Sequence, residues 1–312
     1  METEITAPKL VLRTSSGGVD WELELDRELL LPGRLVPGRL SLRATRDVEA
    51  RGLVVALQAV EHWRHRETTT DGQGHSTTRV VTSRQDLIHE PVQVRGPLRL
   101  ATGEVLTADF ELPVPPVGPA TLEAEDAGLD WTVEAKLDIA GGFDSGISGR
   151  VVVAQPTALL MAGAVPVGEF SLYPAADVAA DGSSGSVELK PMPLVCGEPF
   201  TGVVRFHAPA GTKVRGVRAE IRVHVEATVS QGESGNLTLW TGILGVPGVA
   251  GEDDLVGDRE FPIAGTLPPT PIPSIELPHG RTRASFHVIL DRPWALDTHL
   301  SRDVAIATTS EI

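Results

Sequence analysis

The stretch PGRLVPGRLSLRATRDVEARGLVVALQAVE, residues 32–61, is the most informative about the fold, because its glycine pattern returns later in the chain. The second copy is CGEPFTGVVRFHAPAGTKVRGVRAEIRVHV, residues 196–225. At one constant offset, 197 − 33 = 164 residues, the coinciding positions are Gly33 with Gly197, Gly38 with Gly202, and Arg51-Gly52 with Arg215-Gly216. The sequence therefore predicts an internal repeat and two similar lobes.

The apolar residues of the two copies alternate in the same phase. Leu40, Leu42 and Ala44 fall on Val204, Phe206 and Ala208, and Leu53, Val55, Leu57 and Ala59 fall on Val217, Ala219, Ile221 and Val223. A period of two is typical of strands that bury one face. Further along, Trp131 aligns with Phe286 at an offset of 286 − 131 = 155 residues, so the first copy is nine residues longer between Gly52 and Pro113.

This pattern predicts an all-β protein of two tandem antiparallel β-sandwich lobes, because 312 residues exceed the usual size of one sandwich core. We place the lobes at residues 1–155 and 165–312, with a short helical turn near residues 158–162 between them. The extra length of the first lobe is expected in a long hairpin whose turn is Asp71-Gly72-Gln73-Gly74. Residues 170–173 are expected to repeat the strand at residues 9–13, and Trp131 and Phe286 are expected to point inward at equivalent positions.

Composition limits the partners and the compartment. The net charge of −15 repels phosphate backbones, so we expect no nucleic acid. Cys196 is the only cysteine, which excludes an intrachain disulfide and favours a reducing cytoplasm. The first ten residues lack the basic and apolar regions of a signal peptide, and no apolar run is long enough for a transmembrane segment.

Familiar catalytic motifs are absent: we find no nucleophile elbow, P-loop, HExxH motif or dinucleotide-binding fingerprint. His62 and His65 are three residues apart on a predicted strand, so they point to opposite faces and make poor joint ligands. The carboxylates at residues 123–126 and 252–254 could bind calcium through their oxygens. The alternative is that they are solvated charges in loops. We expect no catalytic residue, cofactor or metal ligand, and a small structural role for Cys196.

The assembled motifs resemble the arrestin-like superfamily, which includes arrestin-domain adaptors and bacterial sporulation-control proteins. The motifs that carry the resemblance are Pro32-Gly33 with Gly38, Arg51-Gly-Leu-Val-Val, Phe110-Glu-Leu-Pro, Trp131-Thr-Val-Glu-Ala-Lys-Leu-Asp and Leu290-Asp-Arg-Pro-Trp294. The Ala, Arg, Gly and Val richness favours the bacterial relatives. The resemblance implies a two-lobed, non-enzymatic scaffold that binds other proteins through loops, edge strands and concave faces.

The leading hypothesis is therefore a cytoplasmic adaptor or regulatory scaffold for protein partners, in bacterial development or signalling. The alternative is an enzyme or small-ligand-binding β-sandwich protein with a dispersed site.

The candidate partner site is the first-lobe hairpin, where Arg64, Arg66, Arg79 and Arg84 gather in an acidic protein. Guanidinium groups would attract an acidic or phosphorylated peptide. The competing interpretation is a solvated hairpin whose arginines pair with Glu67, Asp71 and Asp86.

Overall fold

The computed structural model describes residues 8–139, 144–161, 171–172, 183–210, 215–245, 257–292 and 297–310. Within these ranges the chain is almost entirely β-strand, and the helix α1 (Thr157–Met161) lies at the predicted turn. The all-β prediction is confirmed. No helix of the described residues is long and apolar enough to cross a membrane.

The chain divides into two compact units that are not contiguous in sequence. The first comprises Met1–His62, Thr82–Leu122 and Gly128–Ala154. The second comprises Trp63–Val81, Glu123–Ala127 and Gln155–Ile312, so it takes in two short pieces from the first half of the chain. The lobe ranges 1–155 and 165–312 remain a prediction. They differ from the two units in that Trp63–Val81 and Glu123–Ala127 are counted with the second unit.

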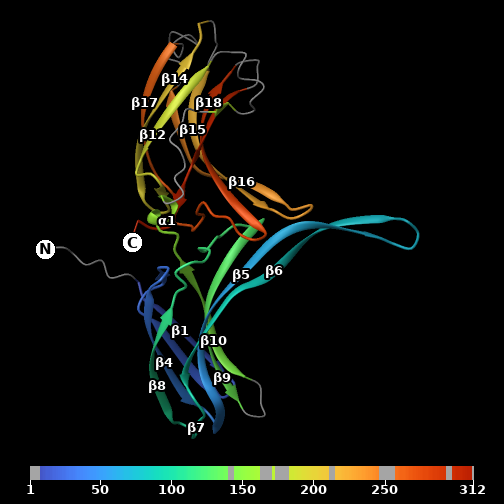
Figure 1. Ribbon diagram of the computed structural model, residues 1–312, viewed down its shortest axis with the longest axis vertical. Helices are drawn as coiled ribbons and strands as arrows, with labels where there is room; N and C mark the ends of the chain where they lie inside the picture. Colours follow the sequence, from blue (N-terminus) through green and yellow to red (C-terminus); the bar gives the residue numbers. More distant parts are fainter. Residues whose placement is uncertain are drawn as a thin grey trace, which may run out of the picture. The chain divides into compact units, whose positions relative to one another are not determined.

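Two sheets form the sandwich of the first unit, and the ends of β5 and β6 between Trp63 and Val81 are counted with the second unit (Figure 1). One has the strand order β1-β2-β4-β8, formed by β1 (Leu10–Ser16), β2 (Val19–Leu25), β4 (Leu35–Ala44) and β8 (Val105–Pro113). The other has the order β3-β10-β9-β5-β6, formed by β3 (Leu29–Leu30), β10 (Ser145–Val153), β9 (Ala127–Ile139), β5 (Val48–Thr70) and β6 (Ser76–Arg95), while β7 (Leu98–Leu100) pairs with β5. Strand β3 pairs with β10 in parallel. The pairs β1 with β2, β2 with β4, β4 with β8, β9 with β10 and β5 with β7 are antiparallel.

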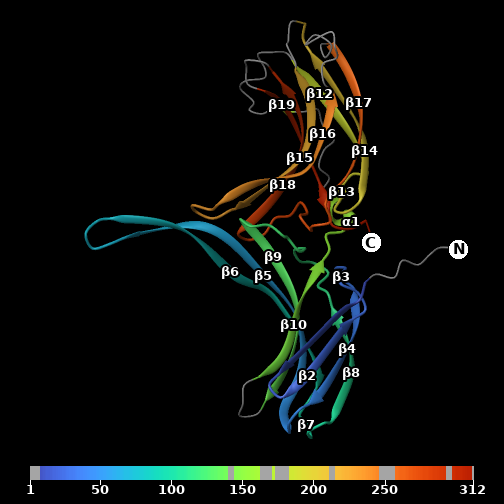
Figure 2. The same cartoon turned by 180° about the vertical axis from the view of Figure 1, so that it is seen from behind.

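The second unit repeats this plan (Figure 2). Its three-stranded sheet has the order β12-β14-β17, with β12 (Ser184–Lys190), β14 (Pro199–Ala208) and β17 (Gly257–Thr266). Its five-stranded sheet has the order β11-β19-β18-β15-β16, with β11 (Ser171–Leu172), β19 (Thr298–Val304), β18 (Gly280–Asp291), β15 (Gly216–Ala227) and β16 (Ser234–Gly245). A separate parallel pair joins β13 (Leu194–Val195) to β20 (Ile306–Ala307).

The core of each unit follows from the alternation of its strands. Strand β2 buries Val19, Trp21, Leu23 and Leu25, and turns the intervening acidic residues outward. Trp131 and Phe286 are both essentially inaccessible, which confirms their inward placement. The indole Nε1 of Trp131 donates to the carbonyl oxygen of Pro119 (3.0 Å), so its one polar atom is satisfied inside the core.

The repeated glycines occupy matching surroundings. Gly33 and Gly197 have φ angles of 75° and 77°, and the nearest atoms to an added Cβ would be those of Pro116 and Pro269. The amide of Gly33 donates to the carbonyl oxygen of Val114 and that of Gly197 to Pro268. The Arg-Gly pairs match as well, because Arg51 pairs with Asp138 as Arg215 pairs with Asp291. These equivalences confirm the internal repeat.

Alanine in place of Gly33 or Gly197 is expected to reduce the free energy of unfolding by about 1–2 kcal/mol, because a side chain is unfavourable on a left-handed backbone. Gly96→Ala is the matched control, since an added Cβ there meets nothing within 4 Å. Urea unfolding of Gly33→Ala, Gly197→Ala and Gly96→Ala would measure the difference. Equal midpoints for the three variants would contradict a turn that requires glycine.

The structure confirms the predicted long hairpin and contradicts the predicted role of the strand at residues 171–172. Strands β5 and β6 have 23 and 20 residues, against 12 each for β15 and β16, so the extra length does lie in the first hairpin. The expected equivalence of residues 170–173 with residues 9–13 is wrong. Strand β11 pairs with β19 in the five-stranded sheet, whereas β1 pairs with β2, the counterpart of β12. Phe170 and Tyr173 lie outside the described residues.

Candidate interaction surface

Beyond Trp63 the hairpin changes from a buried to an exposed structure. Strand β5 is largely buried as far as Glu61 and becomes exposed from Arg66 to Thr70, and residues 76–85 of β6 are exposed or half-exposed throughout. The sequence explains this, because threonines and charged residues replace the apolar alternation. We call residues 63–81 the distal hairpin.

The turn of the distal hairpin is built as its sequence predicts. Asp71 accepts backbone N–H bonds from Gln73 and His75 through Oδ1, both at 2.9 Å, and Gly74 takes a φ of 86°. These bonds hold the pKa of Asp71 below its ordinary value. Hydroxyl pairs, Thr68 with Thr78 and Thr70 with Ser76, join the two strands behind the turn.

The base of the distal hairpin is fixed by backbone bonds within the second unit. The amide of Arg64 donates to the carbonyl oxygen of Asp126, the amide of Glu233 donates to that of Arg64, and the amide of Arg66 donates to that of Gln231, each at 2.9 Å. Trp63 stacks on His279 with ring centroids 4.0 Å apart. These contacts were not predicted, because partners so distant in sequence leave no periodic signal.

Three of the four predicted arginines lie beside carboxylates. Arg64 pairs with Glu125 and lies 3.5 Å from Asp126, Arg66 Nε lies 2.6 Å from Glu233, and Arg79 lies 3.3 Å from Glu67. Two of these acids belong to the cluster at residues 123–126. The arginine cluster is therefore largely neutralised locally rather than presented as free positive charge.

Arg84 has a different environment. It is exposed on β6 and makes no ion pair within 4 Å with the residues that the structure describes. Its charge lies near Asp130, whose pKa is held below its ordinary value first by a hydrogen bond from His62 and then by Arg150 and Arg84. Arg84 is therefore the predicted arginine most available to a ligand.

Strand β6 offers a backbone edge in addition to these charges. Within the part of the chain that the structure describes, it is the last strand in its sheet, next to β5 alone, so one side of its backbone has no neighbouring strand there. Its residues 76–85 include Arg79 and Arg84 and no acid, and Val80 is 43% exposed. An edge strand with these properties can accept an extended peptide as a further strand.

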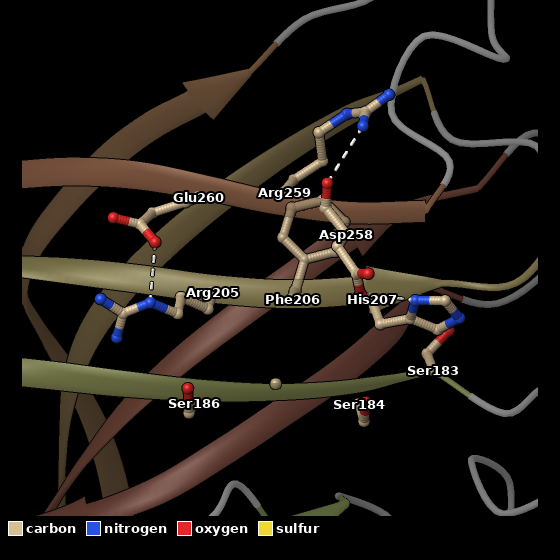
Figure 3. A pocket seen from close by; sticks show the side chains of 10 residues that line it. Ser183, Ser184, Ser186, Arg205, Phe206, His207, Asp258, Arg259 and Glu260 are labelled. Atoms are coloured by element: carbon tan, nitrogen blue, oxygen red, sulfur yellow. Dashed lines mark hydrogen bonds and ion pairs between the residues drawn. The ribbon is translucent and has the colours of Figure 1, made fainter.

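A second polar surface lies on the three-stranded sheet of the second unit (Figure 3). Cross-strand pairs fill it: Arg205 contacts Glu260 at 2.8 Å and Glu188 at 3.1 Å, and His207 Nδ1 lies 2.8 Å from Asp258. The side chain of Asp258 is 96% exposed, so water screens its effect on the imidazole. These contacts are surface ion pairs of adjacent strands, which contribute little to stability.

Metal and thiol chemistry have little support among the described residues. No group of three or more His, Cys, Asp or Glu side chains there is placed to hold a metal ion. The acidic residues at 252–254 lie outside the described ranges. Burial raises the pKa of the Cys196 thiol, which makes the nucleophilic thiolate scarcer at neutral pH.

Fold and surface together define a class: a two-lobed β-sandwich protein with a long exposed hairpin. Residues 8–162 match the family model Spo0M, described as SpoOM protein. The matched range contains every strand of the first sandwich and helix α1. A comparison with curated proteins gave no match.

Proposed function

We propose that the protein is a cytoplasmic, sporulation-related regulatory protein that acts by binding other proteins and not by catalysis. The match of residues 8–162 to the sporulation-control family Spo0M supports the regulatory role. The resemblance of the sequence motifs to arrestin-like adaptors supports the mode of action, in which β-sandwich lobes present edges and loops to partners. The exposed edge of β6 is the observation that carries the proposal.

The partner we propose is an acidic or phosphorylated peptide segment in extended conformation. Backbone hydrogen bonds to the free edge of β6 would supply affinity without regard to side chains. Arg84, and Arg79 once it exchanges Glu67 for a ligand, would supply charge-assisted bonds that select acidic sequences. Arg64 and Arg66 hold the hairpin base and are not part of this proposed contact.

Capture of partners from the native cell tests the proposal. The immobilised protein is expected to retain a specific partner protein. The double variant Arg79→Ser/Arg84→Ser should bind that partner with about tenfold lower affinity, because it loses one or two charge-assisted bonds. Val80→Asp is expected to have a similar effect because it places a negative charge on the edge. The identity of the captured protein follows from mass spectrometry.

Matched controls separate the edge from general charge effects. Arg13→Ser/Arg39→Ser removes two exposed, ion-paired arginines from the other sheet of the first unit, and Val105→Asp alters an exposed valine on β8. Both controls should retain the partner. Undiminished retention by the β6 variants at low salt would show that the binding surface is elsewhere.

A further inference from the structure

An arginine occupies an inward-facing position in the core of the second unit. Arg302 lies on β19 between the buried residues Leu300 and Val304, and only 9% of its surface is exposed. Asp303, the next residue, is exposed. The alternation of the strand therefore directs a guanidinium group to a place where sandwich strands carry apolar side chains.

The internal repeat shows that the fold does not need a charge there. Arg302 pairs with Phe286 across β18 and β19, and Val151 pairs with Trp131 across β9 and β10. Since Trp131 and Phe286 are equivalent, Val151 is the counterpart of Arg302. Val151 is almost completely buried, as a core residue should be.

The guanidinium group is incompletely satisfied. Its Nη1 donates to the carbonyl oxygen of Val187 at 2.9 Å, and its Nε is buried without a hydrogen-bond partner. Among the described residues no carboxylate lies within ion-pair distance of it. A buried guanidinium with unused donors is unfavourable unless an anion or water completes it.

A cavity of about 210 Å³ adjoins this group. Its apolar wall is formed by Val187 and Leu189 of β12, Met192 and Val304. Glu188 and Lys190 also line it, and both are exposed, with Glu188 paired to Arg205 at 3.1 Å. Burial lowers the pKa of Arg302, as expected where water is scarce.

We propose that this cavity binds a small aliphatic carboxylate, whose two oxygens take the free donors of Arg302 and whose hydrocarbon part lies against Val187, Leu189 and Val304. A planar carboxylate matches the fork of a guanidinium group. A phosphate dianion fits less well, because one arginine in an apolar wall does not compensate the desolvation of two charges.

Calorimetric titration of the full chain with hexanoate tests the proposal. We expect saturable binding to the wild type that is weakened at least tenfold in Arg302→Val. Arg302→Lys should weaken it to a lesser degree, because it keeps the charge and loses the fork. Hexylamine, hexanol and inorganic phosphate should bind at least tenfold more weakly than hexanoate. Arg39→Ser, which removes an exposed arginine of β4, should bind hexanoate like the wild type.

Thermal unfolding without added ligand supplies the second readout. Arg302→Val reproduces the residue found in the first lobe, so we expect it to fold and to melt at the same temperature as the wild type or higher. Hexanoate should raise the melting temperature of the wild type and leave that of Arg302→Val unchanged. Absence of hexanoate binding to the wild type would overturn the proposal. A marked loss of stability in Arg302→Val would then assign Arg302 a structural role through its bond to Val187.

Discussion

Trp131→Ala is expected to lower the free energy of unfolding of the first lobe by about 3–5 kcal/mol, the range for deletion of a buried aromatic side chain. Trp131 is only 1% exposed, and its loss would leave a cavity in the centre of β9. The deletion would also leave the carbonyl oxygen of Pro119 without its indole donor. Thermal and denaturant unfolding, followed by far-ultraviolet circular dichroism, would measure the change.

Trp131→Phe is the matched control for this deletion. It keeps most of the apolar volume and loses the indole N–H, so its cost should be clearly smaller than that of Trp131→Ala. Phe286→Ala should destabilise the second lobe comparably, since Phe286 is fully buried and lies near the ring of Trp240. A melting temperature of Trp131→Ala close to that of the wild type would show that β9 does not bury this face.

The second lobe is expected to lose stability as the pH falls from 6.5 towards 4, because His287 is buried. Burial is the main reason why the pKa of His287 falls from 6.5 to about 4, and the charge of Arg222 is the next. Over this interval the unfolded chain binds a proton that the folded chain does not. The contribution is therefore fully present above pH 6.5 and is lost progressively towards pH 4, by about 3 kcal/mol in total.

The neighbours of His287 define how this prediction is tested. Its Nε2 lies 2.7 Å from Ser285 Oγ, and Arg222, His299 and Glu220 surround it electrostatically. His287→Gln should flatten the dependence of the free energy of unfolding on pH between 6.5 and 4. His224→Gln is the control because it removes a half-exposed histidine of β15. Wild-type pH dependence in His287→Gln would assign the effect to other groups, with His299 the first to examine because its pKa is also lowered by burial.

Features with a local signal were predictable from the sequence. The glycines that adopt positive φ at residues 33 and 197 recur at a fixed offset, and Asp71 to Gly74 carries the residues that a tight turn needs. The alternation around Trp131 determines its face directly. Short parallel pairs, such as β3 with β10, escaped prediction because two residues have no periodicity.

The candidate surfaces were predicted less well, because they depend on partners distant in sequence. The arginine cluster of the hairpin is visible in the sequence, whereas the pairing of Arg66 with Glu233 is not. Arg302 gives the opposite case. An arginine in an alternating strand normally suggests an exposed face, and only its register opposite Phe286 shows that it points inward.

The hydrogen bond between Arg66 and Glu233 joins residues that are 167 positions apart, which has a consequence for synthesis on the ribosome. At roughly 5–20 residues per second, the distal hairpin leaves the ribosome on the order of ten to thirty seconds before the segment that fixes its base. During that interval Arg66 lacks its acidic partner Glu233 and the edge of β6 is already exposed. The nascent chain therefore exposes the edge of β6 before the contacts at the base of the hairpin have formed. At this stage β6 can pair with another chain, and a chaperone bound there would prevent it.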